Sequence, residues 1–293
     1  MPGRWNLTVR EGLDVVEIET DTSTALVALQ GAQVLSFVPR GGRDWLWVSE
    51  RARWTRGAAL RGGIPVCFPW FGPHPTEAAF PAHGFARTSA WRLSPAPSPG
   101  GSGAAETGAD VAVELTLTDD EATAKLFPHP FEARLTVTVG AALSLAFEVT
   151  NTGTEPFSFE AALHTYFAVS DVANVAVEGL GGCDFVDKVA GGAVRKEGAA
   201  PLRIAGEVDR VYDSDGPVTL IDAPAGRRLR IAGTNAGSTV LWNPAPAKAA
   251  KLSDVAPEAY RRFVCVESGA IGERRLTVPA GATERLTASV TRC

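Results

Sequence analysis

Short runs of β-forming residues, each ended by Gly, Pro or Asp after roughly 4–8 positions, constrain the fold of this chain most strongly. Sustained helical periodicity is scarce, and residues 256–262 are the best candidate for a short helix. The clearest runs cover residues 13–20, 24–29, 33–38, 111–117, 134–139, 143–150, 218–222, 229–232 and 286–291. Strands that recur every 8–12 residues or so favour a sandwich or barrel over alternating strands and helices. We therefore predict an all-β protein.

Residues 94–110 interrupt this pattern with a stretch of Pro, Gly, Ser and Ala. Such a stretch cannot bury a core, and it could in principle link two domains. The strand pattern continues unchanged on both sides of it, however. We predict a mobile surface loop within a single domain that spans residues 1–293.

Charge and composition argue against several classes of function. The formal net charge is −5, and basic residues form no cluster of the kind that binds nucleic acid or an anionic membrane. No apolar run is long enough to cross a bilayer, and the N-terminus lacks a signal-peptide core. The four cysteines lie far apart, which fits reduced thiols. We expect a cytoplasmic protein that binds neither nucleic acid nor membrane.

Histidine and arginine on glycine-rich turns are the first candidates for chemistry. His83 lies in PAHGFAR (81–87), where Pro and Gly predict a turn that can aim a polar side chain. Arg61 begins RGGIP (61–65), and an aromatic run follows at 68–73. Glycine beside arginine suits a backbone that approaches an anionic ligand closely. The alternative is a structural arginine that caps carbonyl groups, and residue type alone favours it.

A second candidate is the segment FSFEAALHTY, residues 157–166. Read as one strand, it places Phe and Leu side chains on a core face and Glu160, His164 and Tyr166 on the other face. An acid, an imidazole and a phenol on one face fit a polar cleft. A solvent-exposed face explains them equally well at this point.

Carboxylates in apolar strands complete the set of candidates. Glu267 ends the run FVCVE, so it either lies in water at a strand end or is partly buried. Burial would raise its pKa towards that of a working general base. Asp209, within EVDRVY, is a weaker candidate. His74 and His129 lie beside prolines in loops, and we assign both to structure.

Several mechanisms lack their sequence signatures. The chain has no G-x-S-x-G nucleophile elbow, no P-loop and no dinucleotide-binding glycine pattern. Its four histidines and four cysteines show no metal-ligand spacing, so we expect neither a metal nor a cofactor. General acid–base chemistry by imidazoles and a carboxylate, beside arginines suited to an anion, remains.

Nine segments taken in order resemble the aldose 1-epimerase (mutarotase) superfamily and, within it, the hexose-6-phosphate mutarotase branch, also called glucose-6-phosphate 1-epimerase. They are LWVSE (46–50), RGGIPVCFPWFG (61–72), PAHGFAR (81–87), Trp91, LHTYF (163–167), GLG (179–181), DRVY (209–212), LWNP (241–244) and VCVESG (264–269). Each segment is weak alone, but the ordered set spans nearly the whole chain.

The resemblance implies a fold and a set of roles. The fold would be a galactose-mutarotase-like supersandwich of two large antiparallel sheets, with the sugar in a cleft on one sheet. His164 would be the general acid, Glu267 the general base, and His83 a catalytic residue that holds the sugar. The substrate-binding residues would be Asp209 at sugar hydroxyls, with Arg61 and Arg87 at a phosphate. The implied partner is a small sugar phosphate, and we expect the protein to be a monomer.

Three alternatives remain open. A mutarotase for unphosphorylated aldoses would not need the two arginines, and a non-catalytic carbohydrate-binding sandwich would not need the histidine–glutamate pair. A glycosidase would need two catalytic carboxylates, whereas the pattern supplies one beside histidines. Two departures from the family pattern bear on sugar preference: Ala245 stands where a large aromatic is expected, and Ser268 where Pro or Ala is commoner.

Overall fold

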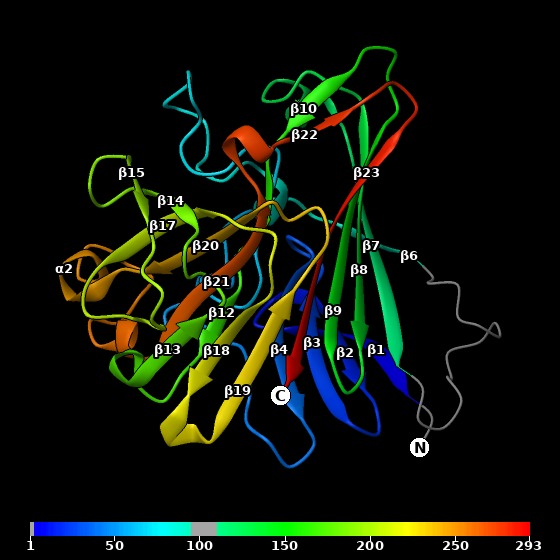
Figure 1. Cartoon of the computed structure of the whole chain (residues 1–293). Helices are drawn as coiled ribbons and strands as arrows, with labels where there is room; N and C mark the ends of the chain where they lie inside the picture. The colour runs from blue at the N-terminus through cyan, green and yellow to red at the C-terminus, as the bar shows by residue number, and fades with distance from the viewer. Residues whose placement is uncertain (1–2, 95–109) are drawn as a thin grey trace.

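The computed structural model describes residues 3–94 and 110–293, and strands make up most of its regular structure (Figure 1). Within these residues two large antiparallel sheets dominate. The nine-stranded sheet has the order β16 (Leu202–Arg203), β13 (Val175–Glu178), β18 (Val218–Asp222), β19 (Arg227–Ala232), β23 (Thr283–Arg292), β9 (Leu143–Asn151), β8 (Phe131–Val139), β7 (Val111–Thr118) and β6 (Arg92–Ser94). The eight-stranded sheet has the order β15 (Ala193–Lys196), β14 (Asp184–Asp187), β17 (Val208–Asp213), β20 (Ser238–Asn243), β21 (Phe263–Ala270), β11 (Ala161–Leu163) and β5 (Val66–Cys67), with β12 (Tyr166–Ala168) also paired to β21.

Smaller elements flank these two sheets. A four-stranded sheet is formed by β1 (Arg4–Arg10), β2 (Leu13–Glu19), β3 (Ser23–Ala28) and β4 (Gln33–Pro39), and a two-stranded one by β10 (Phe157–Phe159) and β22 (Leu276–Val278). The α-helices of the described residues are single turns, α1 (Glu121–Ala124) and α2 (Ala245–Ala249). Short 3₁₀ turns occupy Ala86–Thr88, Val172–Asn174, Ala223–Ala225, Ala259–Arg262 and Gly272–Arg274.

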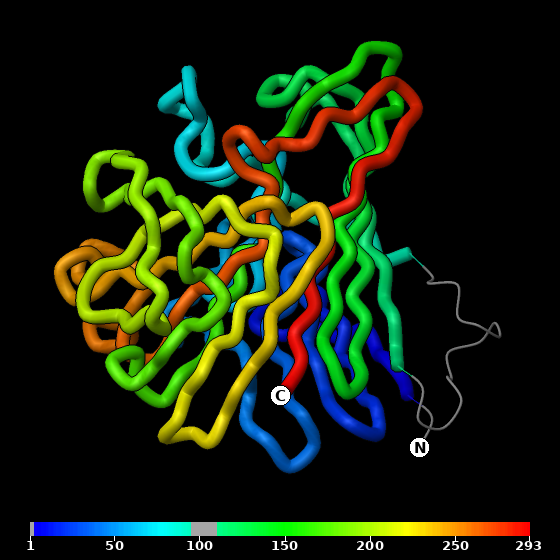
Figure 2. The backbone as a smooth tube through the Cα atoms, viewed as in Figure 1, coloured from blue at the N-terminus to red at the C-terminus, as the bar shows by residue number. Residues whose placement is uncertain are grey.

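One apolar core joins the sheets. Strands β8 and β9 alternate strictly between buried and half-buried residues, so each turns one face inward. The core takes Leu145 and Phe147 from the nine-stranded sheet, Leu241 and Val266 from the eight-stranded sheet and Val34 from the four-stranded sheet. The two large sheets therefore pack face to face. Figure 2 shows the red β23 beside the green strands β9 and β8, with the yellow strands β18 and β19 of the same sheet to their left.

The structure confirms the all-β prediction and all nine predicted strand runs, whose ends differ by a few residues. The helix predicted over residues 256–262 is present only as a 3₁₀ turn over Ala259–Arg262, and α2 was not predicted. Ser94, placed at the start of the predicted mobile loop, instead ends β6. The rest of that loop, residues 95–109, lies outside the described residues.

The prediction of one continuous strand over residues 157–166 is wrong. The segment forms three short strands, and β10 pairs with β22 away from the main sheet. The first break falls at Glu160, whose carboxylate accepts hydrogen bonds from the backbone N–H groups of Phe71 (2.9 Å) and Gly272 (2.7 Å). Glu160 thus ties two loops to the strand instead of facing solvent.

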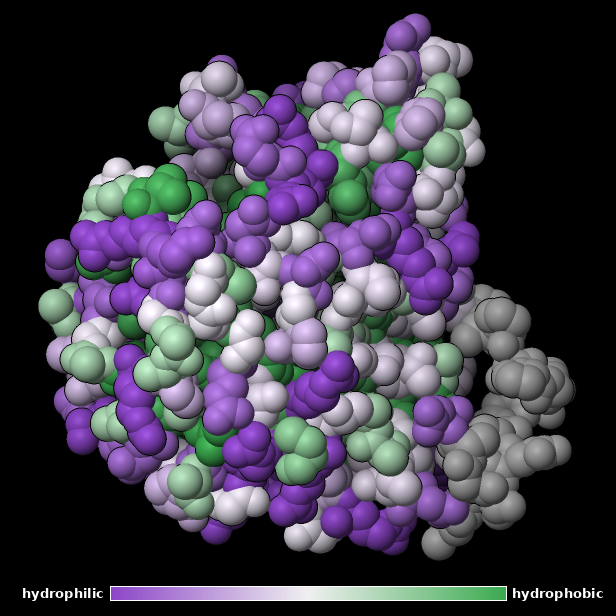
Figure 3. All heavy atoms as spheres, in the orientation of Figure 1, coloured by the Kyte–Doolittle hydropathy of each residue, from purple (hydrophilic) through white to green (hydrophobic). Residues whose placement is uncertain are grey.

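No helix in the described residues is long and apolar enough to cross a membrane. The face shown in Figure 3 is largely polar, with an apolar patch over the β14–β15 hairpin. Val186, Val189 and Val194 are the exposed apolar side chains of this hairpin.

Candidate active site

His164 lies in the second break of the predicted strand, between β11 and β12. Strand β11 pairs Leu163 with Ser268, and β12 pairs Tyr166 with Cys265. His164 and its neighbour therefore stand opposite the middle of β21, where its backbone N–H donates to the Pro65 carbonyl at 3.0 Å instead of to that strand. The imidazole stacks on the Tyr166 ring, with centroids 4.8 Å apart and planes at 7°. This local break aims the ring across the sheet face.

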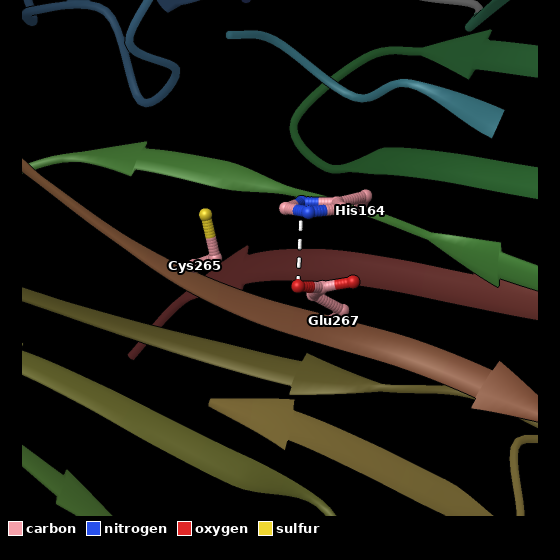
Figure 4. A group of neighbouring side chains, drawn as sticks. All are labelled: His164, Cys265 and Glu267. Atoms are coloured by element: carbon pink, nitrogen blue, oxygen red, sulfur yellow. Dashed lines mark ion pairs between the residues drawn. The ribbon is translucent and has the colours of Figure 1, made fainter. Parts of the chain in front are cut away.

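Glu267 faces His164 from β21, as Figure 4 shows. The carboxylate is only 1% exposed, and its Oε1 lies 3.3 Å from His164 Nδ1. Despite this distance, Nδ1 and both carboxylate oxygens are buried without a hydrogen bond from any described residue. Unpaired buried polar atoms are costly, so this pair is built to meet a ligand.

Burial shifts the pKa values of Glu267 and His164 in opposite directions. It raises the pKa of Glu267 well above its ordinary value, with the Lys188 ammonium opposing and the Asp209 carboxylate adding to the rise. Burial lowers the pKa of His164 well below its ordinary value, and electrostatic interactions with His83, Arg87 and Arg61 lower it further. Both shifts disfavour the charged forms, so the pair favours a single proton and no net charge.

His83 stands on the predicted turn with a positive φ of 65°. Its ring centroid lies 5.6 Å from that of His164 and 4.8 Å from that of Phe71. His83 Nδ1 accepts a hydrogen bond from the Gly72 backbone N–H at 3.3 Å, which places the proton of the neutral ring on Nε2. Burial, followed by the charges of Arg87, Lys188 and Arg61, lowers its pKa to about 3. His83 therefore stays a neutral N–H donor.

Arg61 binds Tyr166, the residue on whose ring His164 stacks. Its Nη1 donates to the Tyr166 hydroxyl at 2.9 Å and its Nε to the Asp254 carboxylate at 3.1 Å. These two partners raise its pKa. The side chain remains 21% exposed.

Arg87 approaches the histidines from the turn Ala86–Thr88. Its Nη2 donates to the Ala82 carbonyl at 2.7 Å, while its Nε is buried without a partner among the described residues. Together with Arg61 it acts electrostatically on both histidines. The structure therefore brings both predicted arginines to the predicted histidines, although each also caps protein groups.

Asp209 and a lysine that sequence reasoning missed complete the site. Asp209 lies on β17, where its carboxylate is 3.5 Å from Lys248 Nζ and acts on Glu267. Lys188 follows β14 and donates its backbone N–H to the Asp209 carbonyl at 2.9 Å. Its ammonium lies 4.6 Å from the Phe71 ring centroid and has no ion pair within the described residues. No motif marks Lys188, because only the hairpin turn carries it to the histidines.

The remaining histidines and cysteines are placed as follows. His74 Nδ1 accepts the Glu77 backbone N–H at 3.0 Å, and His129 stacks on Phe157, so both are structural as predicted. All four cysteines are free. Cys265 lies two residues before Glu267 on β21, and its Sγ, a ring nitrogen of His164 and a Glu267 oxygen all lie within 4.8 Å of one another.

A family model described as aldose 1-epimerase matches residues 14–291. A relative from Salmonella typhimurium is 36% identical over 264 residues, which are 88% of this chain and 83% of the relative. One from Escherichia coli is 35% identical over 262 residues, 89% of this chain and 84% of the relative. One from Cenchrus ciliaris is 34% identical over 264 residues, 88% of this chain and 78% of the relative. All three are provisionally named glucose-6-phosphate 1-epimerase.

Solved structures show the same fold. A provisionally named mutarotase from Salmonella typhimurium superposes with a TM-score of 0.86 at 31% identity, over 99% of this chain and 94% of that chain. A galactose 1-epimerase from Lactobacillus acidophilus superposes with a TM-score of 0.74 over 99% of this chain and 98% of that chain. At 14% identity the second likeness concerns the fold alone. Together they confirm the predicted mutarotase-like supersandwich.

Proposed function

The chain belongs to the aldose 1-epimerase family and is an epimerase, and from this premise we propose that it interconverts the α and β anomers of a hexose 6-phosphate, using His164 and Glu267. One observation carries the proposal. His164 Nδ1 and both Glu267 oxygens are buried, unpaired and close together, and cationic side chains surround them. A proton-transfer pair beside cations fits an anionic sugar.

The reaction needs two coupled proton transfers. His164 gives a proton to the ring oxygen while Glu267 takes one from the anomeric hydroxyl, so the C1–O5 bond breaks and the aldehyde forms. Rotation about C1–C2 presents the other face of the aldehyde, and reclosure returns both protons with the roles exchanged. In this proposal the single proton of the pair moves from Glu267 to His164 before the step. The low pKa of His164 then makes its imidazolium a ready donor, and the high pKa of Glu267 makes its carboxylate a strong acceptor.

The neighbouring side chains orient the substrate in this proposal. His83 donates its Nε2 proton to a sugar oxygen and stabilises the charge that develops there. Asp209 accepts hydrogen bonds from sugar hydroxyls. Arg61, Arg87 and Lys188 hold the phosphate, and the names of the relatives support a phosphorylated hexose as the substrate.

Location and assembly belong to the same proposal. We infer a monomer that acts in the cytoplasm on a small sugar phosphate. The four free cysteines, two of them buried beside the site, fit a reducing compartment.

Loss of either member of the pair tests the mechanism. We expect His164→Ala or Glu267→Gln to slow catalysed anomer exchange by about 10²-fold or more, because each positioned proton transfer contributes at least that much. Exchange is measured by NMR on glucose, galactose and mannose 6-phosphates, with the free sugars as controls. Wild-type rates in either variant contradict the assignment of the pair. Faster exchange of free sugars than of their phosphates would make the protein an ordinary aldose mutarotase.

The proposed binding of the phosphate by Arg61, Arg87 and Lys188 requires its own test. We expect Arg87→Ala, Arg61→Ala and Lys188→Ala each to raise KM for a hexose 6-phosphate about tenfold, since a lost charge-assisted hydrogen bond contributes on the order of 1.4 kcal/mol. KM for the free hexose should stay unchanged in all three. Arg4→Ala is the matched control, because Arg4 is paired with Glu19 on the four-stranded sheet. Unchanged KM values for the phosphate in both arginine variants would remove the phosphate from the proposal.

A further inference from the structure

The cluster of His164, Cys265 and Glu267 offers chemistry that anomer exchange does not use. The mechanism proposed above requires an imidazole and a carboxylate but no thiol. Yet Cys265 is fully buried on β21 and turns its Sγ to the same side of the sheet as Glu267 (Figure 4). All three ligand atoms lie within 4.8 Å of one another.

We propose that His164, Cys265 and Glu267 form an inhibitory binding site for a borderline-soft divalent cation such as Zn²⁺. One nitrogen, one sulfur and one oxygen are a donor set that Zn²⁺ accepts, and three protein ligands leave a fourth position for water. The 3.3 Å between His164 Nδ1 and Glu267 Oε1 is close to the spacing of roughly 3.4 Å between two ligands on one tetrahedral Zn²⁺. Cys265 reaches such an ion by a shift of about 1 Å.

The unpaired state of the other two ligands supports this site independently. His164 Nδ1 and both Glu267 oxygens are buried without a hydrogen bond from the described residues. Once the pair has lost its proton, all three atoms can donate a lone pair, and a metal ion would satisfy all of them at once. The thiol of Cys265 and the His164–Glu267 pair each release one proton to solvent when the ion binds, so a thiolate and a carboxylate balance its two positive charges.

Neighbouring charges set the affinity of this site for a divalent cation. Asp209 adds a carboxylate that acts on both Cys265 and Glu267. Arg61 and Lys188 lie close enough to oppose a cation. The site therefore holds the ion reversibly and competes with substrate, because the ion occupies both proton-transfer groups.

Cobalt spectroscopy tests the site directly. Co²⁺ replaces Zn²⁺ in such sites and gives a near-ultraviolet charge-transfer band only when a thiolate binds it. We expect the band in the wild-type protein, its loss in Cys265→Ala, and its displacement by saturating hexose 6-phosphate. Cys67→Ala is the matched control, because Cys67 is equally buried but its Sγ contacts His83 Nδ1 at 3.5 Å, so the band should persist.

Inhibition gives a second measurement. We expect Zn²⁺ to inhibit anomer exchange in the wild type and in Cys67→Ala, and EDTA to relieve this inhibition. Inhibition of Cys265→Ala should be at least tenfold weaker. The activity of Cys265→Ala without metal should remain normal, which shows that the variant folds. If Cys265→Ala does not fold, Glu267→Gln decides: its Co²⁺ affinity should fall at least tenfold.

Absence of the band in the wild type, or its persistence in Cys265→Ala, overturns the proposal, as does unchanged Co²⁺ affinity in Glu267→Gln. The band does not depend on catalysis. The metal site and the proposed activity can therefore fail separately.

Discussion

At the scale of single residues, burial decides what each polar group of the site can do. His83 is the clearest case, because its Nδ1 accepts the Gly72 N–H and protonation there would break this bond. Its pKa of about 3 keeps the ring neutral throughout the physiological range. Such a histidine cannot act as a cationic acid, but it can donate its Nε2 proton steadily to a sugar oxygen.

This neutrality has a measurable effect on stability. The folded-state pKa of His83 is about 3, whereas an unfolded histidine titrates near 6.5. Between these values the unfolded state binds one more proton at His83, so the free energy of unfolding falls as pH falls, by up to about 1.4 kcal/mol per pH unit. His83→Asn should remove this contribution, and Asn tolerates the positive φ at this turn.

Denaturant unfolding at pH 4, 5 and 6 measures the effect. The pH dependence of the free energy of unfolding should be shallower in His83→Asn than in the wild type. His164 contributes in the same direction in both proteins. Parallel profiles would show that His83 titrates normally in the folded protein.

At the scale of elements, close backbone contacts hold the His83 turn against the strands. The Phe68 carbonyl accepts the Phe85 N–H at 3.0 Å, and Gly84 packs directly on the Phe68 backbone. A Cβ at Gly84 would lie 1.9 Å from the Phe68 carbonyl oxygen. Only glycine allows this approach, and the approach fixes where His83 points.

Substitution of Gly84 should therefore damage both stability and activity. Gly12 is the matched control, because its φ of +84° resembles the +72° of Gly84 but nothing lies within 4 Å of its added Cβ. We expect Gly12→Ala to lower the free energy of unfolding by about 1–2 kcal/mol, the cost of a left-handed alanine. Gly84→Ala should cost roughly 2 kcal/mol more, because backbone atoms must also move.

Thermal or denaturant unfolding of the two variants, together with anomer exchange, checks this expectation. Gly12→Ala should retain wild-type activity, since it changes a hairpin turn of the four-stranded sheet. Equal stability losses in the two variants would mean that the His83 turn can relax without cost.

At the scale of the whole molecule, the core fixes the site between the sheets. Phe68 adjoins Cys67 on β5, and its ring centroid lies 5.3–6.0 Å from those of five other phenylalanines. These are Phe85, Phe127, Phe131, Phe147 and Phe159, which come from the His83 turn, the loop between α1 and β8, the nine-stranded sheet and β10. A close-packed aromatic cluster resists deformation. The histidine turn is therefore anchored to both layers of the sandwich.

The elements that the sequence predicted well are those with strong local signals. Strands β7, β8 and β9 of the nine-stranded sheet alternate buried and more exposed residues over their whole length. The segment 157–166 shows a matching alternation of apolar and polar residues in its sequence, yet it breaks twice because Glu160 and His164 bond to distant loops. Periodicity reports which residues can face a core and does not report where a tertiary contact ends a strand.

The sequence by itself determined the strand pattern, the ordered family segments and the six candidate residues His83, His164, Glu267, Arg61, Arg87 and Asp209, because residue type and local spacing carry that information. Only the tertiary structure decided between the open alternatives for Glu267, which is buried at 1% exposure, and only it brought Lys188 and Cys265 to the site. The physical reason is that pKa values and ligand sets depend on distances between strands far apart in the chain. Such distances are set by how the sheets pack.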